Sequence, residues 1–260
     1  MCIRDRSVGM GRDPLDQAEL PFVYEGSGLR TLPTMASLLV NSRLLDDCGW
    51  QAEQVVHGEE SLTLNRPLAD AGEVILDSKV LKVTDKGPEH GAVIVVESRA
   101  RSVADEQPVF TVRRTLVARG DGGFGGASHN RSSGREMPAG EADLSCAART
   151  RPDQALWFRL LGDRGVLHAD PGRARRSGFA RPILHGLCTA GIACRAVLRT
   201  ICEYDPTLIR SFDLRFTAPV YPGETLRTDM WQQANIVSFR MRAEDRNVTV
   251  VDDGRCVLAT

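Results

Sequence analysis

The stretch from Ile183 to Ile201, ILHGLCTAGIACRAVLRTI, is apolar around most of its circumference when it is wound as a helix. A helix that is apolar nearly all round has to be buried nearly all round. Two arginines in its second half argue against burial in lipid. Small residues recur along it, at Gly186, Ala190, Gly191 and Ala193. The stretch therefore predicts a helix closely wrapped by a curled antiparallel sheet, and the alternative is a helix between two layers of an α/β protein.

Strand-like runs surround this helix in a repeated order. Apolar and polar residues alternate in them, with many Val, Ile and Thr, which predicts strands. The runs are residues 54–64, 73–83, 92–103 and 109–118, and then 211–220, 225–232, 236–243 and 248–251. A first helix is predicted over Leu32–Leu45, ahead of the first set of strands. A helix followed by several antiparallel strands, twice, indicates a duplicated α+β unit.

A segment rich in Gly, Ser and charge, GDGGFGGASHNRSSGREMPAGEA, separates the two parts. Its composition is typical of a linker. We therefore expect an N-terminal half over residues 8–119, a linker over 120–142 and a C-terminal half over 143–260. The opening MCIRDRS has no apolar core of a signal peptide and resembles translated sequencing-adapter sequence, so we expect the fold to begin near Val8.

The composition argues against several classes of protein. A net charge of -1 provides no basic field for nucleic acid or for an anionic membrane surface. No apolar run reaches the length needed to span a bilayer. The seven cysteines are odd in number and form no CxxC, which favours a reduced, cytoplasmic protein over a disulfide framework.

The loop GDRGVLHADP, residues 162–171, brings Asp163 and His168 close together in sequence. An acid and an imidazole on one loop can orient a water molecule and move its protons. The same residues also suit an ordinary polar turn. A metal site that adds Asp170 and His185 is conceivable, but the spacing matches no dedicated motif, and we expect no metal.

Residues 154–198, QALWFRLLGDRGVLHADPGRARRSGFARPILHGLCTAGIACRAVL, resemble the core of the MaoC-like or type 2 enoyl-CoA hydratase family. PILHGLCT is the most specific part. Residues 13–39, DPLDQAELPFVYEGSGLRTLPTMASLL, resemble the family's opening half-domain, and FTAPVYPGETLRTDMW resembles its late strands. The resemblance implies a double hot-dog fold, an α+β architecture of two units, each with a long helix wrapped by an antiparallel sheet.

The resemblance also implies an activity: reversible hydration of trans-2-enoyl-CoA to (R)-3-hydroxyacyl-CoA by a hydro-lyase without a cofactor. It gives Asp163 and His168 the proton transfers and Gly186 a place at the thioester oxygen. A glycine in the first helical turn suits that place, because backbone N–H groups there have no intrahelical partner. The resemblance further implies an acyl-CoA substrate, a homodimer, and an N-terminal half that accommodates the acyl chain.

Other residues near the loop are weaker candidates for substrate binding. His185, at the start of the long helix, is either a core histidine or a residue that shapes the site. Arg173 and Arg176 suit the phosphates of CoA, although a solvated basic face would look the same. Three further histidines, at positions 57, 90 and 129, lie in polar surroundings and are expected to be solvated.

One departure from the family pattern keeps two other functions open. The family usually has Asn-Pro where this chain has Gly165-Val166, which removes a hydrogen-bonding side chain and a stiff residue. We expect this change to weaken the loop, and an asparagine at position 165 to raise the rate. The alternatives are a catalytically weakened acyl-CoA-binding subunit and a hot-dog thioesterase. The thioesterase commonly uses a carboxylate on the helix, which Ile183–Ile201 lacks.

Overall fold

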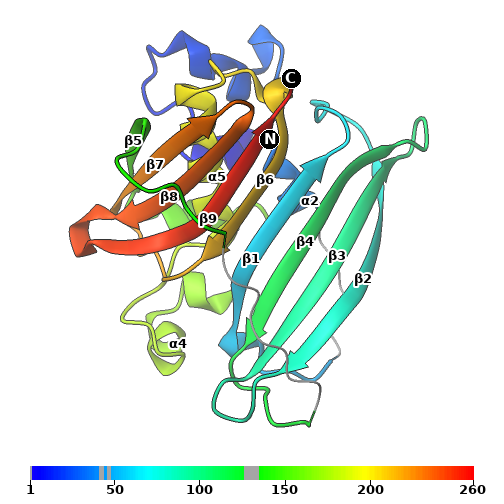
Figure 1. Cartoon of the computed structure of the whole chain (residues 1–260), viewed down its shortest axis with the longest axis vertical. Coiled ribbons are helices and arrows are strands. Elements are labelled where there is room, and N and C mark those ends of the chain that lie inside the picture. The colour runs from blue at the N-terminus through cyan, green and yellow to red at the C-terminus, as the bar shows by residue number, and fades with distance from the viewer. Residues whose placement is uncertain (1, 41–43, 46–47, 126–134) are drawn as a thin grey trace.

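The structure, a computed structural model, describes residues 2–40, 44–45, 48–125 and 135–260. Nine strands form one antiparallel sheet in the order β2-β3-β4-β1-β6-β9-β8-β7-β5, and its two halves meet where β1 pairs with β6 (Figure 1). The strands are β1 (Val55–Leu64), β2 (Val74–Asp85), β3 (Ala92–Ser102), β4 (Pro108–Ala118), β5 (Leu144–Arg149), β6 (Ile209–Phe216), β7 (Thr225–Gln233), β8 (Ile236–Ala243) and β9 (Val248–Leu258).

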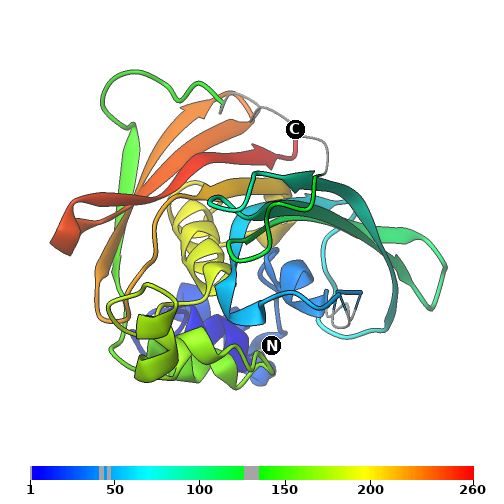
Figure 2. The same cartoon turned by 90° about the horizontal axis from the view of Figure 1, so that it is seen from below.

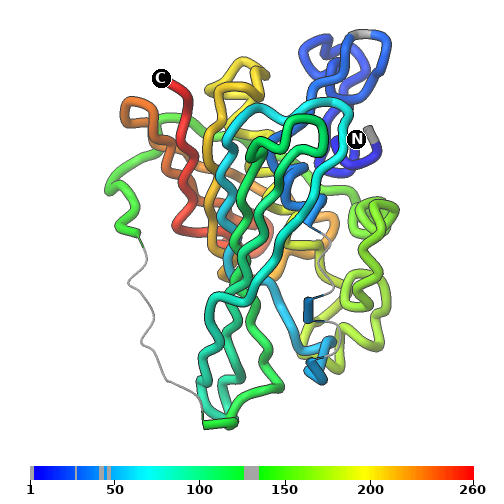
Figure 3. Tube along the Cα trace, turned by 90° about the vertical axis from the view of Figure 1, so that its right-hand side faces the viewer, coloured from blue at the N-terminus to red at the C-terminus, as the bar shows by residue number. Residues whose placement is uncertain are grey.

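Five α-helices accompany the sheet in the part of the chain that is described. They are α1 (Cys2–Ser7), α2 (Met35–Leu39), α3 (Gln154–Arg159), α4 (Pro171–Arg176) and α5 (Gly186–Thr200). Figure 2 shows α5 lying within the concave side of the curled sheet. The N-terminal segment and the segment from α3 to α4 lie on that same side (Figure 3). Among the described residues, no helix has both the length and the apolar character that crossing a bilayer requires.

The wrapped helix predicted over 183–201 is confirmed as α5, whose residues from Cys188 to Leu198 are all buried. Its small residues permit close contacts. A side chain at Gly191 would come within 2.6 Å of Val8, so no larger residue fits there without movement. The eight predicted strands are also observed, and β9 extends beyond its predicted end to Leu258. Edge strand β5, LSCAAR, was not predicted, because it has no β-branched residue and pairs only with β7.

The helix predicted over Leu32–Leu45 is observed only as α2, which has five residues. Residues 41–43 of the predicted helix lie outside the described part of the chain. The side chain of Arg114, on β4, donates hydrogen bonds to the carbonyls of Ser37 and Val40. Carbonyls at the end of a helix have no intrahelical partner. The arginine therefore satisfies them from the sheet, and α2 ends at this point.

The fold begins earlier than expected, because α1 packs against α3. Arg4 and Asp5 are buried, and the carbonyl of Ser7 accepts a hydrogen bond from Gln154. The exclusion of the opening segment was therefore wrong for this structure. It rested on the resemblance to adapter sequence and the absence of an apolar core, and neither carries information on contacts made so far along the chain.

Part of the predicted linker is tied to the N-terminal half. The carboxylate of Asp85 accepts hydrogen bonds from the backbone N–H groups of Gly87, Gly123 and Gly125, at 2.7–2.8 Å. Residues 126–134 lie outside the described part of the chain. The glycines at the start of the segment thus bring backbone donors close to one buried acid, which their composition did not reveal.

Candidate active site

A pocket of about 410 Å³ opens at the N-terminal end of α5, between the two halves of the sheet. Asp163, His168 and Gly186 all line it. The C-terminal half also contributes residues 216–220, from the last residue of β6 onward, and the N-terminal half contributes residues of β1 and β4. The three residues predicted to be catalytic are therefore brought together at one cavity.

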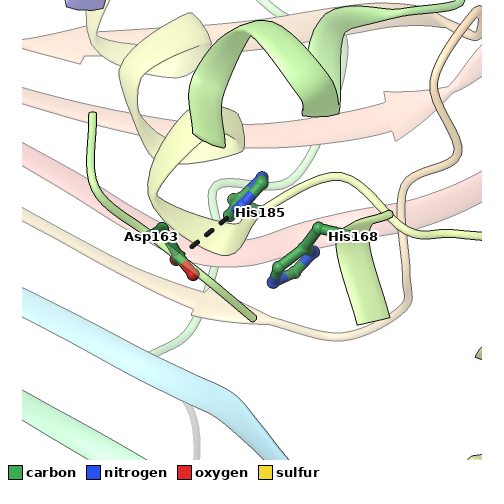
Figure 4. A group of neighbouring side chains, drawn as sticks. All are labelled: Asp163, His168 and His185. Carbon is green, nitrogen blue, oxygen red and sulfur yellow. Dashed lines mark ion pairs between the residues drawn. The ribbon is translucent and has the colours of Figure 1, made fainter. Parts of the chain in front are cut away.

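The side chains of Asp163, His168 and His185 lie close together at the start of α5 (Figure 4). One ligand atom from each of the three lies within 4.8 Å of the others. Separations of this size allow one water molecule to lie at hydrogen-bonding distance from two of the groups. The fourth conceivable metal ligand, Asp170, instead accepts hydrogen bonds from Gly172 and Arg173 at the start of α4.

His168 is held by its backbone surroundings in one tautomer. Its Nδ1 lies 2.9 Å from the carbonyl oxygen of Ile183. Because a carbonyl can only accept, Nδ1 carries the proton and Nε2 keeps a free lone pair in the neutral ring. Burial lowers the pKa of His168 below its ordinary value, which favours this neutral form. The imidazole is thus prepared to accept a proton.

His185 lies beside the loop that carries Asp163 and His168 and is 2% exposed. Its ring stacks on His168 with centroids 3.6 Å apart, and its centroid lies 4.8 Å from that of Phe158. Burial, and then the charge of protonated His168, lower the pKa of His185 to about 2. Its Nε2 lies 3.7 Å from the carboxylate of Asp163. A neutral His185 therefore packs against His168 and lies near Asp163, and neither of its ring nitrogens has a hydrogen-bond partner among the described residues.

Gly186 is the first residue of α5, where the backbone N–H precedes the first intrahelical bond, from Thr189 to His185. A side chain here would come within 3.1 Å of the ring of Phe216 and 3.5 Å of His57. Glycine thus keeps the space in front of this N–H open. The arrangement can stabilise negative charge on an oxygen placed in the pocket.

Gly165 leaves little room for a side chain in this loop. A Cβ at this position would lie 2.9 Å from Cδ2 of His168 and 3.0 Å from Oδ1 of Asp163. The same Oδ1 accepts a hydrogen bond from the Gly165 N–H at 2.8 Å. A side chain at position 165 therefore fits only if His168 or Asp163 shifts. The expectation that an asparagine there raises the rate disagrees with this packing.

Arg173 and Arg176 lie on α4, are exposed, and are not among the residues that line the pocket. Arg173 forms an ion pair with Glu53. Arg119, just after β4, does line the pocket and packs over the ring of Phe179 at 5.0 Å. The contact of Arg173 and Arg176 with CoA stays a prediction. Arg119 had no local signal in the sequence, because only the sheet brings the end of β4 to this loop.

The expectation that His57 is solvated was wrong. Its side chain is 16% exposed, lines the pocket, and pairs with Glu60 at 2.9 Å. Its ring also lies 5.1 Å from that of Phe216, across the junction of the two halves. His90 is exposed, as expected. His129 lies outside the described residues.

Comparisons with known proteins cover both halves of the chain. The family model of the MaoC-like domain matches residues 135–253. The family model of the MFE-2 hydratase 2 N-terminal domain matches residues 6–120. A peroxisomal enoyl-CoA hydratase 2 from Arabidopsis thaliana is 35% identical, over 93% of this chain and 83% of that protein. A peroxisomal multifunctional enzyme type 2 from Mus musculus is 32% identical over 95% of this chain, which covers only 34% of that longer protein.

Solved structures agree with these matches. A MaoC-like dehydratase from Phytophthora capsici is 28% identical, with a TM-score of 0.85 over 100% of this chain and 91% of that chain. A hypothetical protein from Mycobacterium tuberculosis, described as a double hot-dog fold, has a TM-score of 0.59 over 98% of this chain and 90% of that chain. At 16% identity this likeness bears on the fold alone. The expected double hot-dog architecture is confirmed.

Proposed function

The chain belongs to the MaoC-like, type 2 enoyl-CoA hydratase family, and we propose that Asp163 and His168 carry the proton transfers with which it hydrates enoyl-CoA to (R)-3-hydroxyacyl-CoA. The observation that supports this most strongly is the convergence of their side chains within 4.8 Å, in the pocket that contains Gly186. A hydro-lyase needs a group that takes a proton from water and a route by which a proton reaches C2 of the substrate.

The reaction follows from the two groups and the helix end. A water molecule held by Asp163 and His168 attacks C3 of the enoyl thioester, and Nε2 of His168 accepts one of its protons. Negative charge then develops on the thioester oxygen, toward which the N–H of Gly186 donates. The proton on Nε2 of His168 then passes by way of Asp163 to C2, so water has been added and both groups end in their starting states. No redox step occurs, and we propose that no cofactor is needed.

The proposal is tested by incubating the purified chain with crotonyl-CoA. We expect the conjugated absorbance to fall as (R)-3-hydroxybutyryl-CoA forms, with no free CoA released. We expect His168→Gln to lower kcat by about 100- to 10,000-fold. Its control is His90→Gln, since His90 is exposed and not among the pocket residues.

The two alternatives predict other products. Free CoA without hydroxyacyl-CoA would identify a thioesterase. Crotonyl-CoA that binds without being converted would identify an acyl-CoA-binding subunit, and either result would contradict the proposal. A cytoplasmic location and a homodimer, both expected from the sequence, stay predictions. Light scattering of the purified chain measures the second.

A further inference from the structure

His185 is a buried polar side chain whose hydrogen-bonding capacity is unused. It is 2% exposed, and neither ring nitrogen forms a hydrogen bond within the part of the chain that the structure describes. Buried polar groups in proteins nearly always pair with another protein group or with an ordered water molecule. Since His185 lines the pocket beside Asp163 and His168, we look for its partner in the pocket itself.

The loop that carries Asp163 and His168 offers no side chain at position 165 to bind the reacting water. The family pattern has an asparagine there, and this chain has Gly165. The packing also leaves no room for one, because a Cβ at position 165 would lie 2.9 Å from Cδ2 of His168 and 3.0 Å from Oδ1 of Asp163. A third side chain that binds the water therefore has to come from another element, and His185 at the start of α5 is close enough.

The three polar groups are spaced for one water molecule. A ring nitrogen of His168, a ring nitrogen of His185 and a carboxylate oxygen of Asp163 lie within 4.8 Å of one another, so some point is within about 2.8 Å of all three. That is the length of an ordinary hydrogen bond. Zinc bonds to nitrogen and oxygen of about 2.0–2.2 Å join atoms no more than about 4.4 Å apart, so separations of up to 4.8 Å suit water better than zinc.

The hydrogen bonds of such a water molecule require a donor as its third partner. The carboxylate of Asp163 only accepts, and Nε2 of His168 has a free lone pair, so these two groups take the two O–H groups of the water. One lone pair on the water oxygen has to stay free to attack C3 of the substrate. The other lone pair is available to an N–H or O–H group.

His185 can be this donor. Burial chiefly lowers its pKa to about 2, so the ring is neutral and has one N–H. Nε2 is the nitrogen near Asp163, with 3.7 Å between Nε2 and Oδ2. The negative charge of the carboxylate favours the tautomer that carries the proton on Nε2. The N–H of His185 is therefore on the side of the ring where Asp163 lies.

Resting on the proposed function, we propose that His185 binds the reacting water, with its Nε2–H donating to the water oxygen while Asp163 and His168 accept the two O–H groups. The donor orients the lone pair that attacks C3. It also stabilises the negative charge that grows on this oxygen as His168 removes a proton. His185 gains and loses no proton, so the balance of the hydration reaction is unchanged.

The test compares His185→Gln with His185→Met in the full-length chain. The two side chains are nearly equal in length and both replace the ring that stacks on His168, but only glutamine has an N–H that can reach the water. We expect kcat for crotonyl-CoA to be lower in His185→Met than in His185→Gln by about tenfold or more. KM should differ by less than about threefold, because the lost hydrogen bond is to water and not to the substrate.

Equal kcat values in the two variants, both shown to be folded by calorimetry, would overturn the proposal. A side chain that only fills space beside His168 would give this result, since glutamine and methionine fill nearly the same volume. The comparison therefore separates the hydrogen bond of His185 from its packing.

A high-resolution crystal structure of the wild-type chain measures the water site directly. We expect an ordered water molecule at hydrogen-bonding distance from Nε2 of His185 and from the carboxylate of Asp163, and we expect it to be absent in His185→Met. A direct hydrogen bond between His185 and Asp163 with no water between them would overturn the proposal. So would a metal ion with bonds of about 2.0–2.2 Å to these groups.

Failure of the hydratase assignment would look different. If the wild-type chain hydrates no enoyl-CoA, the proposed function fails, and the crystal structure alone then decides whether His185 binds a water molecule. If the chain is active and the two variants have equal kcat values, the proposed function stands and the role of His185 is wrong.

Discussion

The two halves of the sheet are alike in their strands and unlike in what the strands enclose. In the C-terminal half, strands β5–β9 surround a helix of 15 residues, which is buried along most of its length. In the N-terminal half, strands β1–β4 accompany a helix of five residues. The first arrangement makes a closed core with the reacting groups at its end. The second leaves inward-facing positions of β1 and β4 exposed to a pocket.

This difference shows how the two halves of a repeated architecture can have different functions. Where a helix fills the curled sheet, the enclosed side chains have no room for a ligand. Where the helix is cut short by Arg114, the same sheet face becomes one wall of the site. We therefore expect substitutions in the C-terminal half of the pocket to affect the chemical step, and substitutions in the N-terminal half to affect selectivity and stability.

The largest expected effect compares one carboxylate from each half. Asp163→Asn should lower kcat for crotonyl-CoA by about 100- to 10,000-fold, because the amide cannot accept or return the proton. Glu60→Gln should change kcat by less than about tenfold but lower the free energy of unfolding by about 1–3 kcal/mol, since Arg114 loses its charged partner. Kinetics and urea denaturation measure the two. Equal losses of kcat in both variants would contradict the assignment of the chemical step to the C-terminal half.

A smaller effect on kcat is expected from a substitution in the loop that carries Asp163 and His168. Gly165→Ala should lower kcat by about 10- to 100-fold, because its Cβ would contact both His168 and Asp163. Gly172→Ala, on α4 and outside the pocket lining, is the matched control and should keep the wild-type rate. A rate in Gly165→Ala equal to that of the control would mean that the loop relaxes freely. In that event the loop would accept a side chain at position 165 without loss of activity.

The smallest expected effect is on stability as a function of pH. The pKa values of His168 and His185 are both below the ordinary value of 6.5, chiefly through burial. Below that pH the unfolded chain binds more protons than the folded one, so stability is fully present above about pH 6.5 and declines as the pH falls. The slope should reach about 1.4 kcal/mol per pH unit for His185, whose pKa falls to about 2, and His168 should add to it.

Urea denaturation between about pH 5 and 8 measures this slope. His185→Gln should flatten it, because one of the two buried imidazoles is gone. His90→Gln should not, since His90 is exposed in the N-terminal half. A slope that His185→Gln leaves intact would show that the C-terminal histidines are not its source.

The local pattern of the sequence was enough for most of the architecture. The apolar circumference of 183–201 predicts a helix that has to be wrapped, and alternation predicts the strands, since both are properties of neighbouring residues. The loop carrying Asp163 and His168 was found in the same way, because both residues lie on one short segment. The resemblance to a family then supplied their roles.

Only the tertiary structure determines which residues lie opposite the loop of Asp163 and His168. His57, Arg114 and Arg119 enter the pocket because β1 pairs with β4 and with β6, and no sequence period records which strands become neighbours. The end of α2 is decided by an arginine more than 70 residues away along the chain. Such contacts depend on distances that arise only after the chain has closed its long loops, which is why the chemistry could be predicted from one segment and the shape of the acyl site could not.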